Sequence, residues 1–310
     1  MLESHVMSFK PGFSRLSVLQ ISAVALIAAA LWIAANFKAK GKADFDFTVT
    51  PSRWEFAAFI DVPQCQEPSG IAIDADAGIV WLVDDGGANR PASLQKYKQI
   101  TSVSQGGKEY PALEFISKLE LGRDLEGVAI NTSNGRIYVA DEFRDKVYEV
   151  DGDKMTLLRA FVVKREFNGR MAIKNAGNGI EGIAFRPERG APLGGRFYLA
   201  NQDDPTCVLR VTIPKEGGED PKVPLPIEIE WVFKGEQINL GDIMWNEAEG
   251  TLWLSHAWSN LLEIINPDNA IEEPRWETLP GAAQEGIALD GEGRLWIAQD
   301  VGGIAVYDKN

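Results

Sequence analysis

Acidic side chains recur at one position of a repeated phrase, and they are the residues best suited to chemistry in this chain. Glu126, Glu181 and Glu285 each precede a glycine and a short aliphatic run, and Ser69 and Gly241 hold the same position in two further copies. Carboxylates gathered around one opening repel one another unless a hard cation neutralises them, and Ca²⁺ takes about six to eight oxygen ligands. We therefore predict Glu126, Glu181 and Glu285 as metal ligands, with Ca²⁺ as the cofactor.

A structural role is the alternative for the same glutamates. A side chain that recurs in every copy of a repeat can accept hydrogen bonds from backbone N–H groups of the neighbouring copy and so hold the two copies together. Both interpretations place the carboxylates where repeats meet, and the sequence leaves the choice open.

A second phrase follows each copy and ends in a polar residue: Asp84, Asp141, Asn201, His256 or Gln299. In an antiparallel hairpin the start of the first strand lies beside the end of the second. The two sets of polar residues should therefore converge on one opening. We predict Asp84, Asp141, Asn201 and His256 as ligand-binding residues there.

His256 and Arg123 have further possible roles at this opening. His256 is the one histidine outside the N-terminal tail, and it could act as a general base or metal ligand; a packed histidine beside Trp253 and Trp258 is the alternative. Arg123 lies in a loop expected on the same side, where a guanidinium could bind a phosphate or carboxylate. Ordinary pairing with nearby Asp and Glu is the alternative for Arg123.

Well-marked catalytic motifs are missing from the sequence. It contains no Gly-x-Ser-x-Gly, no phosphate-binding Gly-x-x-x-x-Gly-Lys-Ser/Thr, no Cys-x-x-Cys and no His-Glu-x-x-His. The hydrolase, nucleotide and zinc chemistries that these motifs support are therefore not indicated. Which residues would be catalytic is left unknown.

The elements that must position these residues follow from the spacing of the repeats. The five copies start at intervals of 57, 55, 60 and 44 residues, which is the period of one supersecondary unit. Both phrases are rich in β-branched and aromatic residues and are joined by turn residues, as in a β-hairpin. Further short strands follow in the first four repeats, including 93–98, 113–121, 156–164 and 226–233.

Five repeats of four strands predict an all-β protein with a five-bladed β-propeller. The fifth repeat lacks a fourth strand, whereas Trp54–Val62 forms a strand with no hairpin partner nearby. This strand can fill the vacancy and leave no open sheet edge. A six-bladed propeller and a β-sandwich are the alternatives.

Composition agrees with a globular acidic domain. The chain has 310 residues, 45% hydrophobic residues and a formal net charge of −14. An acidic balance excludes nucleic acid as an expected partner. Cys65 and Cys207 are too few for a disulfide framework, and we expect two free thiols.

The N-terminal part has the pattern of a membrane anchor. Residues 16–37 form 22 positions without a charge, about 33 Å as a helix, which matches a bilayer core. We predict a tail at 1–15, a transmembrane helix or signal anchor at 16–37, a tether at 38–52 and a propeller at 53–310. A cleavable signal peptide is the alternative. Although the flanking lysines do not favour export, we place the chain in the bacterial inner membrane, single-pass, with the propeller in the periplasm.

The ordered phrases support a family resemblance. Glu67-Pro68-Ser69-Gly70-Ile71, Asp124-Leu125-Glu126-Gly127, Asn178-Gly179-Ile180-Glu181-Gly182 and Gln284-Glu285-Gly286-Ile287, together with the N-terminal anchor, resemble the SdiA-regulated (YjiK-like) propeller family over residues 54–308. The resemblance implies an envelope propeller without a securely assigned activity, distantly similar to phytase-type esterase-like propellers and calcium-dependent lactonases. The fourth repeat departs from the pattern because Gly241-Asp242 replaces Glu-Gly.

Two functions from different classes follow. The first is a membrane-anchored binding module that uses the opening of the central channel to hold a small anionic ligand or an envelope protein, with Ca²⁺ bound there. The second is a calcium-dependent hydrolase of a phosphoester or lactone, in which His256 or Asp141 would handle the proton.

Overall fold

The computed structural model describes residues 49–310 apart from 88–89, 106–107, 174–178, 204, 235–238, 258, 270–271 and 282–283, and apart from the side chains of 101–108. The described helical segments are two short 3-10 turns, η1 (Glu142–Arg144) and η2 (Pro192–Gly194). Neither they nor any other described segment forms a helix long and apolar enough to cross a membrane. The predicted span at 16–37 lies outside the described residues.

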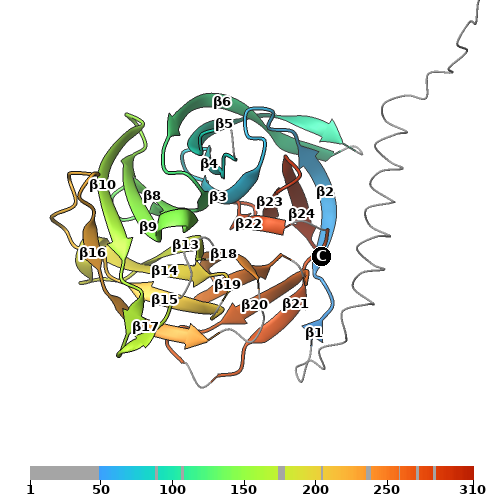
Figure 1. The fold of residues 1–310 in the computed structure, drawn as a ribbon. Helices are drawn as coiled ribbons and strands as arrows, with labels where there is room; N and C mark the ends of the chain where they lie inside the picture. Colours follow the sequence, from blue (N-terminus) through green and yellow to red (C-terminus); the bar gives the residue numbers. More distant parts are fainter. Residues whose placement is uncertain are drawn as a thin grey trace, which may run out of the picture. The chain divides into compact units, whose positions relative to one another are not determined.

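Five antiparallel blades surround a central channel (Figure 1). Each blade starts with its innermost strand, and the five innermost strands contact one another in a closed circle. In chain order the blades are β3 (Pro68–Asp74), β4 (Ile79–Asp84), β5 (Ser93–Gln105) and β6 (Lys108–Glu120); β7 (Leu125–Asn131), β8 (Arg136–Asp141), β9 (Lys146–Asp151) and β10 (Thr156–Val163); β13 (Ile180–Pro187), β14 (Gly195–Asn201), β15 (Cys207–Val211) and β17 (Ile229–Lys234); β18 (Leu240–Asn246), β19 (Thr251–His256), β20 (Leu261–Ile265) and β21 (Arg275–Thr278); and β22 (Gln284–Leu289), β23 (Leu295–Gln299), β24 (Ile304–Lys309) and β2 (Trp54–Ile60).

The N-terminal strand β2 closes the ring. It pairs antiparallel with β24, so that Trp54 lies opposite Lys309 and Ile60 opposite Ile304. The last blade therefore joins both ends of the domain, which removes an open sheet edge. The predicted five-bladed propeller with its shared last blade is confirmed, and the six-bladed and sandwich alternatives are excluded.

Two outer edges carry short additions that the sequence did not predict. The expected strand at 226–233 is divided: β16 (Leu225–Ile227) runs parallel to β10 of the second blade, whereas β17 completes the third blade. Similarly, β1 (Val49–Thr50), in the segment assigned to the tether, runs parallel to β21. Each addition covers backbone groups of an exposed edge, which explains why these residues pair outside their own repeat. A two-stranded hairpin, β11 (Glu166–Phe167) and β12 (Arg170–Met171), follows the second blade.

The core consists of five apolar layers, one between each pair of neighbouring blades. Each layer is built in the same way from two neighbouring blades. One blade contributes the second residue after its repeat glycine, and the next blade contributes the first residue after its own; in the fourth blade Asp242 stands in place of the glycine. A small side chain thus faces a β-branched one at four of the five junctions. These pairs are Ala72 with Val128, Ala129 with Ile183, Ala184 with Ile243, Met244 with Ile287, and Ala288 with Ile71.

Both cysteines belong to these layers. Cys65 and Cys207 are buried and unpaired, as the sequence predicted. Burial raises the pKa of Cys207 to about 12 and raises that of Cys65 as well, so both remain thiols at neutral pH.

Candidate functional site

A β-bulge places the repeated glutamates. All five innermost strands shift register against their second strand at the step that contains the repeat glutamate or its counterpart. A bulge sets two residues opposite one and redirects a side chain. The result is that Glu126, Glu181 and Glu285 leave the sheet at one end of the channel, where the innermost strands begin.

The glycine after each glutamate is required because neighbouring innermost strands touch there. A Cβ atom added to Gly127 would lie 2.7 Å from the Cα atom of Gly182, and one added to Gly70 would lie 3.0 Å from the Cα atom of Gly127. Such distances leave no room for any side chain. The Glu-Gly pair therefore combines a ligand-type residue with the closest packing of the ring.

Carboxylates from strands and loops gather at this end, which we call the acidic mouth. Its members come from the first, second, third and fifth blades: Glu67, Asp85, Asp124, Glu126, Glu142, Glu181 and Glu285. Two trios of side chains have oxygens within 4.8 Å of one another, namely Glu67 with Asp84 and Asp85, and Asp85 with Asp124 and Glu126. The structure thus brings Glu126 close to two loop carboxylates, and Glu181 and Glu285 belong to neither trio.

At four acids of the acidic mouth, the pKa is raised by burial first and by the charges of neighbouring acids second. Burial, followed by the charges of neighbouring acids, raises the pKa of Glu126 and of Glu181 well above the usual value. The same causes raise the pKa of Asp85 to about 7 and that of Glu285 to about 7. The cluster therefore cannot carry its full negative charge at neutral pH without a cation.

Glu142 connects the two sides of the mouth. Gly179 donates its backbone N–H to Oε1 of Glu142 at 2.9 Å. The carboxyl group also shares hydrogen bonds with the side chains of Glu181 and Asp124. Burial is the largest cause that raises the pKa of Glu142. One side chain of the second blade thus orders acids of both the second and the third blade.

Sequence reasoning did not single out Asp124 and Glu67, although a signal for both exists. Each lies two residues before the repeat position held by Glu126 or Ser69. Each backbone carbonyl also accepts the N–H of the residue that follows the second strand: Asp85 donates to Glu67 at 3.3 Å and Glu142 donates to Asp124 at 2.9 Å. An alignment of the repeats that starts two residues before the repeat position would therefore have identified Asp124 and Glu67.

Asp84, Asp141, Asn201 and His256, the four residues predicted to bind a ligand at the ends of the second strands, are buried and bound within their own blades. Asp141 accepts a hydrogen bond from the Tyr148 hydroxyl at 2.8 Å, and Nδ2 of Asn201 donates to two loop carbonyls. His256 Nε2 lies 2.9 Å from Oε2 of Glu263. Asp84 alone of the four also belongs to an acidic trio.

Asp84 anchors the loop that leads into the mouth. It accepts backbone N–H groups of Gln66 at 3.1 Å and Gly86 at 3.2 Å, and it forms an ion pair with Arg90. Arg90 also pairs with Glu67 at 2.6 Å. Arg90 therefore partly neutralises the trio of Glu67, Asp84 and Asp85, which we call the outer trio. Asp85, Asp124 and Glu126 form the inner trio.

Arg123 lies at the same end and is exposed. Its guanidinium carbon stands 4.3 Å from the ring centroid of Phe143, a residue of η1, and the aromatic ring favours a cation in this position. The charge of Arg123 also lowers the pKa of Asp124 against the effect of burial. A cationic group thus borders the acidic mouth.

At the repeat position of the fourth blade there is no carboxylate. Gly241 stands in the glutamate position, and Asp242 replaces the glycine. Asp242 is 2% exposed, and its Oδ2 accepts the backbone N–H of Ile287 at 2.9 Å. Burial raises its pKa well above the usual value. Its carboxyl group therefore joins blades four and five.

Comparisons with known proteins agree with the fold. Residues 63–206 match the model of a family described as "Phytase-like: Esterase-like activity of phytase", which covers the first two blades and part of the third. No curated protein matches the chain. Together with the ring of blades, the family match places the chain among the β-propellers.

Solved structures are similar at low sequence identity. Glutaminyl cyclase of Myxococcus xanthus has a TM-score of 0.53 and 12% identity, over 84% of this chain and 98% of that one. A nidogen/laminin complex has a TM-score of 0.47 and 15% identity, over 75% and 72%. Hydrazine synthase of Kuenenia stuttgartiensis has a TM-score of 0.43 and 11% identity, over 83% and 59%. The first of these supports the propeller fold alone.

Proposed function

We propose that this propeller binds Ca²⁺ at the acidic mouth, between Asp85, Asp124 and Glu126, and holds a small anionic ligand beside it. The observation that carries the proposal is the inner trio itself: three carboxylates from two blades bring oxygens within 4.8 Å of one another. Hard cations such as Ca²⁺ take carboxylate oxygens as ligands.

The donor set fits a cation in a second respect. Among the described residues, no group donates a hydrogen bond to the buried Oδ1 of Asp85, and the Arg90 guanidinium stands 3.8 Å from it. A buried carboxylate oxygen without a partner is costly, and a divalent ion would satisfy it. Glu181 and Glu285, the other two predicted ligands, add negative charge to the same part of the channel and belong to the proposed site.

An anionic ligand suits this site because a bound ion would leave Arg123 as a further positive contact. Ca²⁺ at the trio would present open coordination positions, and the exposed guanidinium could hold a second oxygen of a phosphate or carboxylate. An envelope protein with a phosphate or carboxylate group on an exposed loop could bind in the same way as the small anionic ligand. Asp84, Asp141, Asn201 and His256 would support the loops around this ligand.

Tethering to a membrane belongs to the same proposal. It is supported by the uncharged run at 16–37, which would place the propeller in the periplasm on a single-pass anchor. Kinship with the SdiA-regulated family is proposed on the phrases quoted above. Fractionation of cells that express the full chain, with alkaline extraction, would show whether it remains in the membrane.

A hydrolase is the second candidate, and the match to a family described by esterase-like activity of phytase favours it. In this chain Glu285, which stands outside the trio proposed to hold Ca²⁺ and whose pKa lies at about 7, could accept or give a proton near neutral pH. Bound Ca²⁺ would supply Lewis-acid polarisation of a phosphoryl or carbonyl oxygen. His256 is fully buried against Glu263, so the proton-handling role passes to Glu285.

The deciding experiment is a thermal melt of the purified full chain, first with a chelator and then with increasing Ca²⁺. A ligand at 100 times its dissociation constant stabilises a folded protein by about 2.7 kcal/mol, which is several degrees in Tm. Asp85→Asn should abolish the shift, and Asp61→Asn, the same change at an exposed site after β2, should leave it intact. An unchanged Tm at saturating Ca²⁺ would contradict the cation site.

Turnover separates the two candidates. The same protein with Ca²⁺ would be incubated with p-nitrophenyl phosphate and with a γ-lactone. Hydrolysis that Asp85→Asn removes would make the mouth an active site. A Ca²⁺-dependent Tm shift without hydrolysis of either compound would support the binding module.

A further inference from the structure

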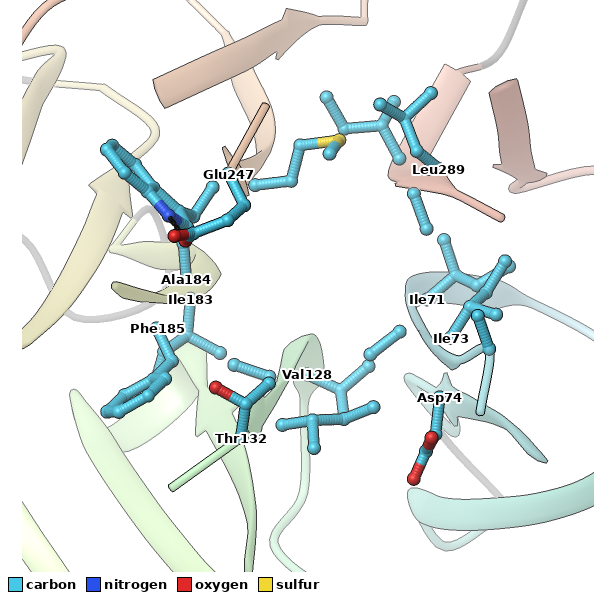
Figure 2. Close-up of a pocket in the computed structure, with 18 of the residues that line it drawn as sticks. Ile71, Ile73, Asp74, Val128, Thr132, Ile183, Ala184, Phe185, Glu247 and Leu289 are labelled. Atoms are coloured by element: carbon cyan, nitrogen blue, oxygen red, sulfur yellow. Dashed lines mark hydrogen bonds between the residues drawn. The ribbon is translucent and has the colours of Figure 1, made fainter. Parts of the chain in front are cut away.

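The opposite end of the channel has a different chemistry. A cavity of about 790 Å³ is lined by the second halves of all five innermost strands, and its labelled side chains surround an open centre in Figure 2. Because the glutamates stand at the starts of these strands, the cavity faces away from the acidic mouth. We call it the apolar funnel.

Two levels of apolar side chains form the wall of the funnel. The deeper level holds the residues that follow the repeat glycine or, in the fourth blade, Asp242; all are β-branched, and all are buried because they also pack between blades: Ile71, Val128, Ile183, Ile243 and Ile287. The outer level, two residues further along each strand, holds Ile73, Ile130, Phe185, Trp245 and Leu289. Of this outer level only Phe185 is fully buried, so apolar surface remains in contact with solvent. Ligand pockets commonly have about 300–1,000 Å³ and such walls.

The rim of the funnel is negatively charged. Asp74, Asp76 and Glu247 line its edge, and the lining includes no lysine or arginine among the described residues. Trp245 holds Glu247 in place through its Nε1, which donates to Oε2 at 2.5 Å. No described cation forms an ion pair with any of the three rim carboxylates.

Arg186, which stands beside the lining residue Trp245, is already neutralised. Arg186 lies 4.9 Å above the Trp245 ring, and its guanidinium donates to both carboxylate oxygens of Asp268, at 2.7 and 2.5 Å. Asp268 raises the pKa of Arg186 and thus keeps it charged and paired. Arg186 therefore does not cancel the charge of Glu247.

We infer that the apolar funnel binds a small amphiphilic cation, with its apolar body against the outer level of apolar side chains and its ammonium group at the rim. Charge complementarity selects the sign of the ligand: three carboxylates without a cationic partner attract an amine and repel a carboxylate or phosphate. The size of the cavity limits the ligand to a single small molecule. This site is separate from the proposed Ca²⁺ site and does not depend on it.

The test uses octyltrimethylammonium as the cationic probe and octanoate as an anion of similar chain length. Calorimetric titration of the full chain, with chelator and again with Ca²⁺, should show one-to-one binding of the cation that is at least about tenfold tighter than that of the anion. The ratio should be the same in both conditions, because the acidic mouth lies at the other end of the channel.

Three variants complete the test. Asp76→Asn combined with Glu247→Gln should weaken binding of the cation about tenfold, and Leu289→Trp, which adds bulk to the wall of the funnel, should weaken binding of both probes. Asp153→Asn is the matched control, since Asp153 is 99% exposed on an outer hairpin and does not line the cavity.

Equal affinity for the two probes, no saturable binding, or equal weakening by the Asp153 control would overturn the inference. The rim variants change exposed side chains, so they test it even if Leu289→Trp does not fold.

Discussion

The side-chain oxygens of Asp85 and Glu126 lie within 4.8 Å of one another although the two residues belong to different blades. Asp85 follows the second strand of the first blade, and Glu126 stands on the bulge of the innermost strand of the second blade. Repulsion between the two carboxylates destabilises the contact between the first and second blades. A cation bound between the carboxylates would instead stabilise this contact. Ligand binding and the stability of the ring should therefore be coupled.

Glu126→Gln should weaken Ca²⁺ binding by about 10- to 100-fold, because it removes a proposed carboxylate ligand from the inner trio. The same change should raise Tm in chelator, since it removes a buried charge that its neighbours repel. Calorimetry and melts would measure both effects. Glu55→Gln, on the exposed face of β2, is the control and should alter neither; a Glu126→Gln protein that binds Ca²⁺ normally would contradict the site.

Stability of the metal-free protein should fall as pH rises from about 4 to 7. Burial and neighbouring acids raise the pKa of Asp85 from 3.8 to about 7 and that of Glu285 from 4.5 to about 7. A raised pKa means that the folded state binds more protons than the unfolded state, so stability declines from the unfolded pKa to the folded pKa and then levels.

Chemical denaturation at several pH values would check this slope. Saturating Ca²⁺ should flatten it, because the ion replaces the protons in the mouth. A stability that rises between pH 5 and 7 in chelator would show that other groups dominate.

Repetition explains why the sequence predicted so much of the fold. The Glu-Gly step marks the same bulge in each innermost strand, so Glu126 and Glu181 could be placed at the channel from spacing alone. Closure of the ring by the N-terminal strand could also be predicted from the sequence, because the fifth repeat lacks a fourth strand and the strand that starts at Trp54 has no partner nearby.

Contacts that depend on loop conformation were not predictable in the same way. Asp124 and Glu142 meet because η1 turns the chain back after the second strand, and no local pattern fixes that turn. His256 was expected to face the opening, whereas its blade provides a buried partner in Glu263. The short strand β16 lies in the third repeat of the sequence but pairs with β10, the outer edge strand of the second blade.

Gly127→Ala should destabilise the protein by about 3 kcal/mol, since its Cβ would lie 2.7 Å from the Cα of Gly182 and from the nitrogen of Ile183 and backbone cannot move aside cheaply. Gly241→Ala is the matched control on another innermost strand. There the nearest atoms stand at 3.3 Å, and the cost should stay below about 1 kcal/mol. Urea denaturation would compare the two, and equal losses would refute close contact of the strands as the reason for the glycine.

Asp242→Asn should stabilise the protein at pH 7 by about 1 kcal/mol. No donor from the described part of the chain reaches Oδ1 of this buried carboxyl group, and ionisation of such a group is costly. An asparagine keeps an oxygen for the Ile287 N–H and carries no charge. Denaturation at pH 7 measures the gain, which should shrink toward pH 4 as the native aspartate becomes protonated; a loss of stability at pH 7 would show that Asp242 is held as a carboxylate.

Glu263→Leu should destabilise the protein by about 3 kcal/mol, because it leaves His256 buried without its partner. Both side chains are 0% exposed, and the imidazole also lies 5.5 Å from the Trp276 ring. The double variant His256→Leu with Glu263→Leu should lose less than the sum of the single changes, since neither buried polar group remains unpaired. A double-mutant cycle by urea denaturation measures this coupling.

The same variants decide what His256 does. If the pair only supports the fourth blade, the double variant should bind Ca²⁺ and any anionic ligand of the mouth with unchanged affinity. A folded double variant that has lost ligand binding or turnover would instead give His256 the role at the opening that its position in the repeat suggested.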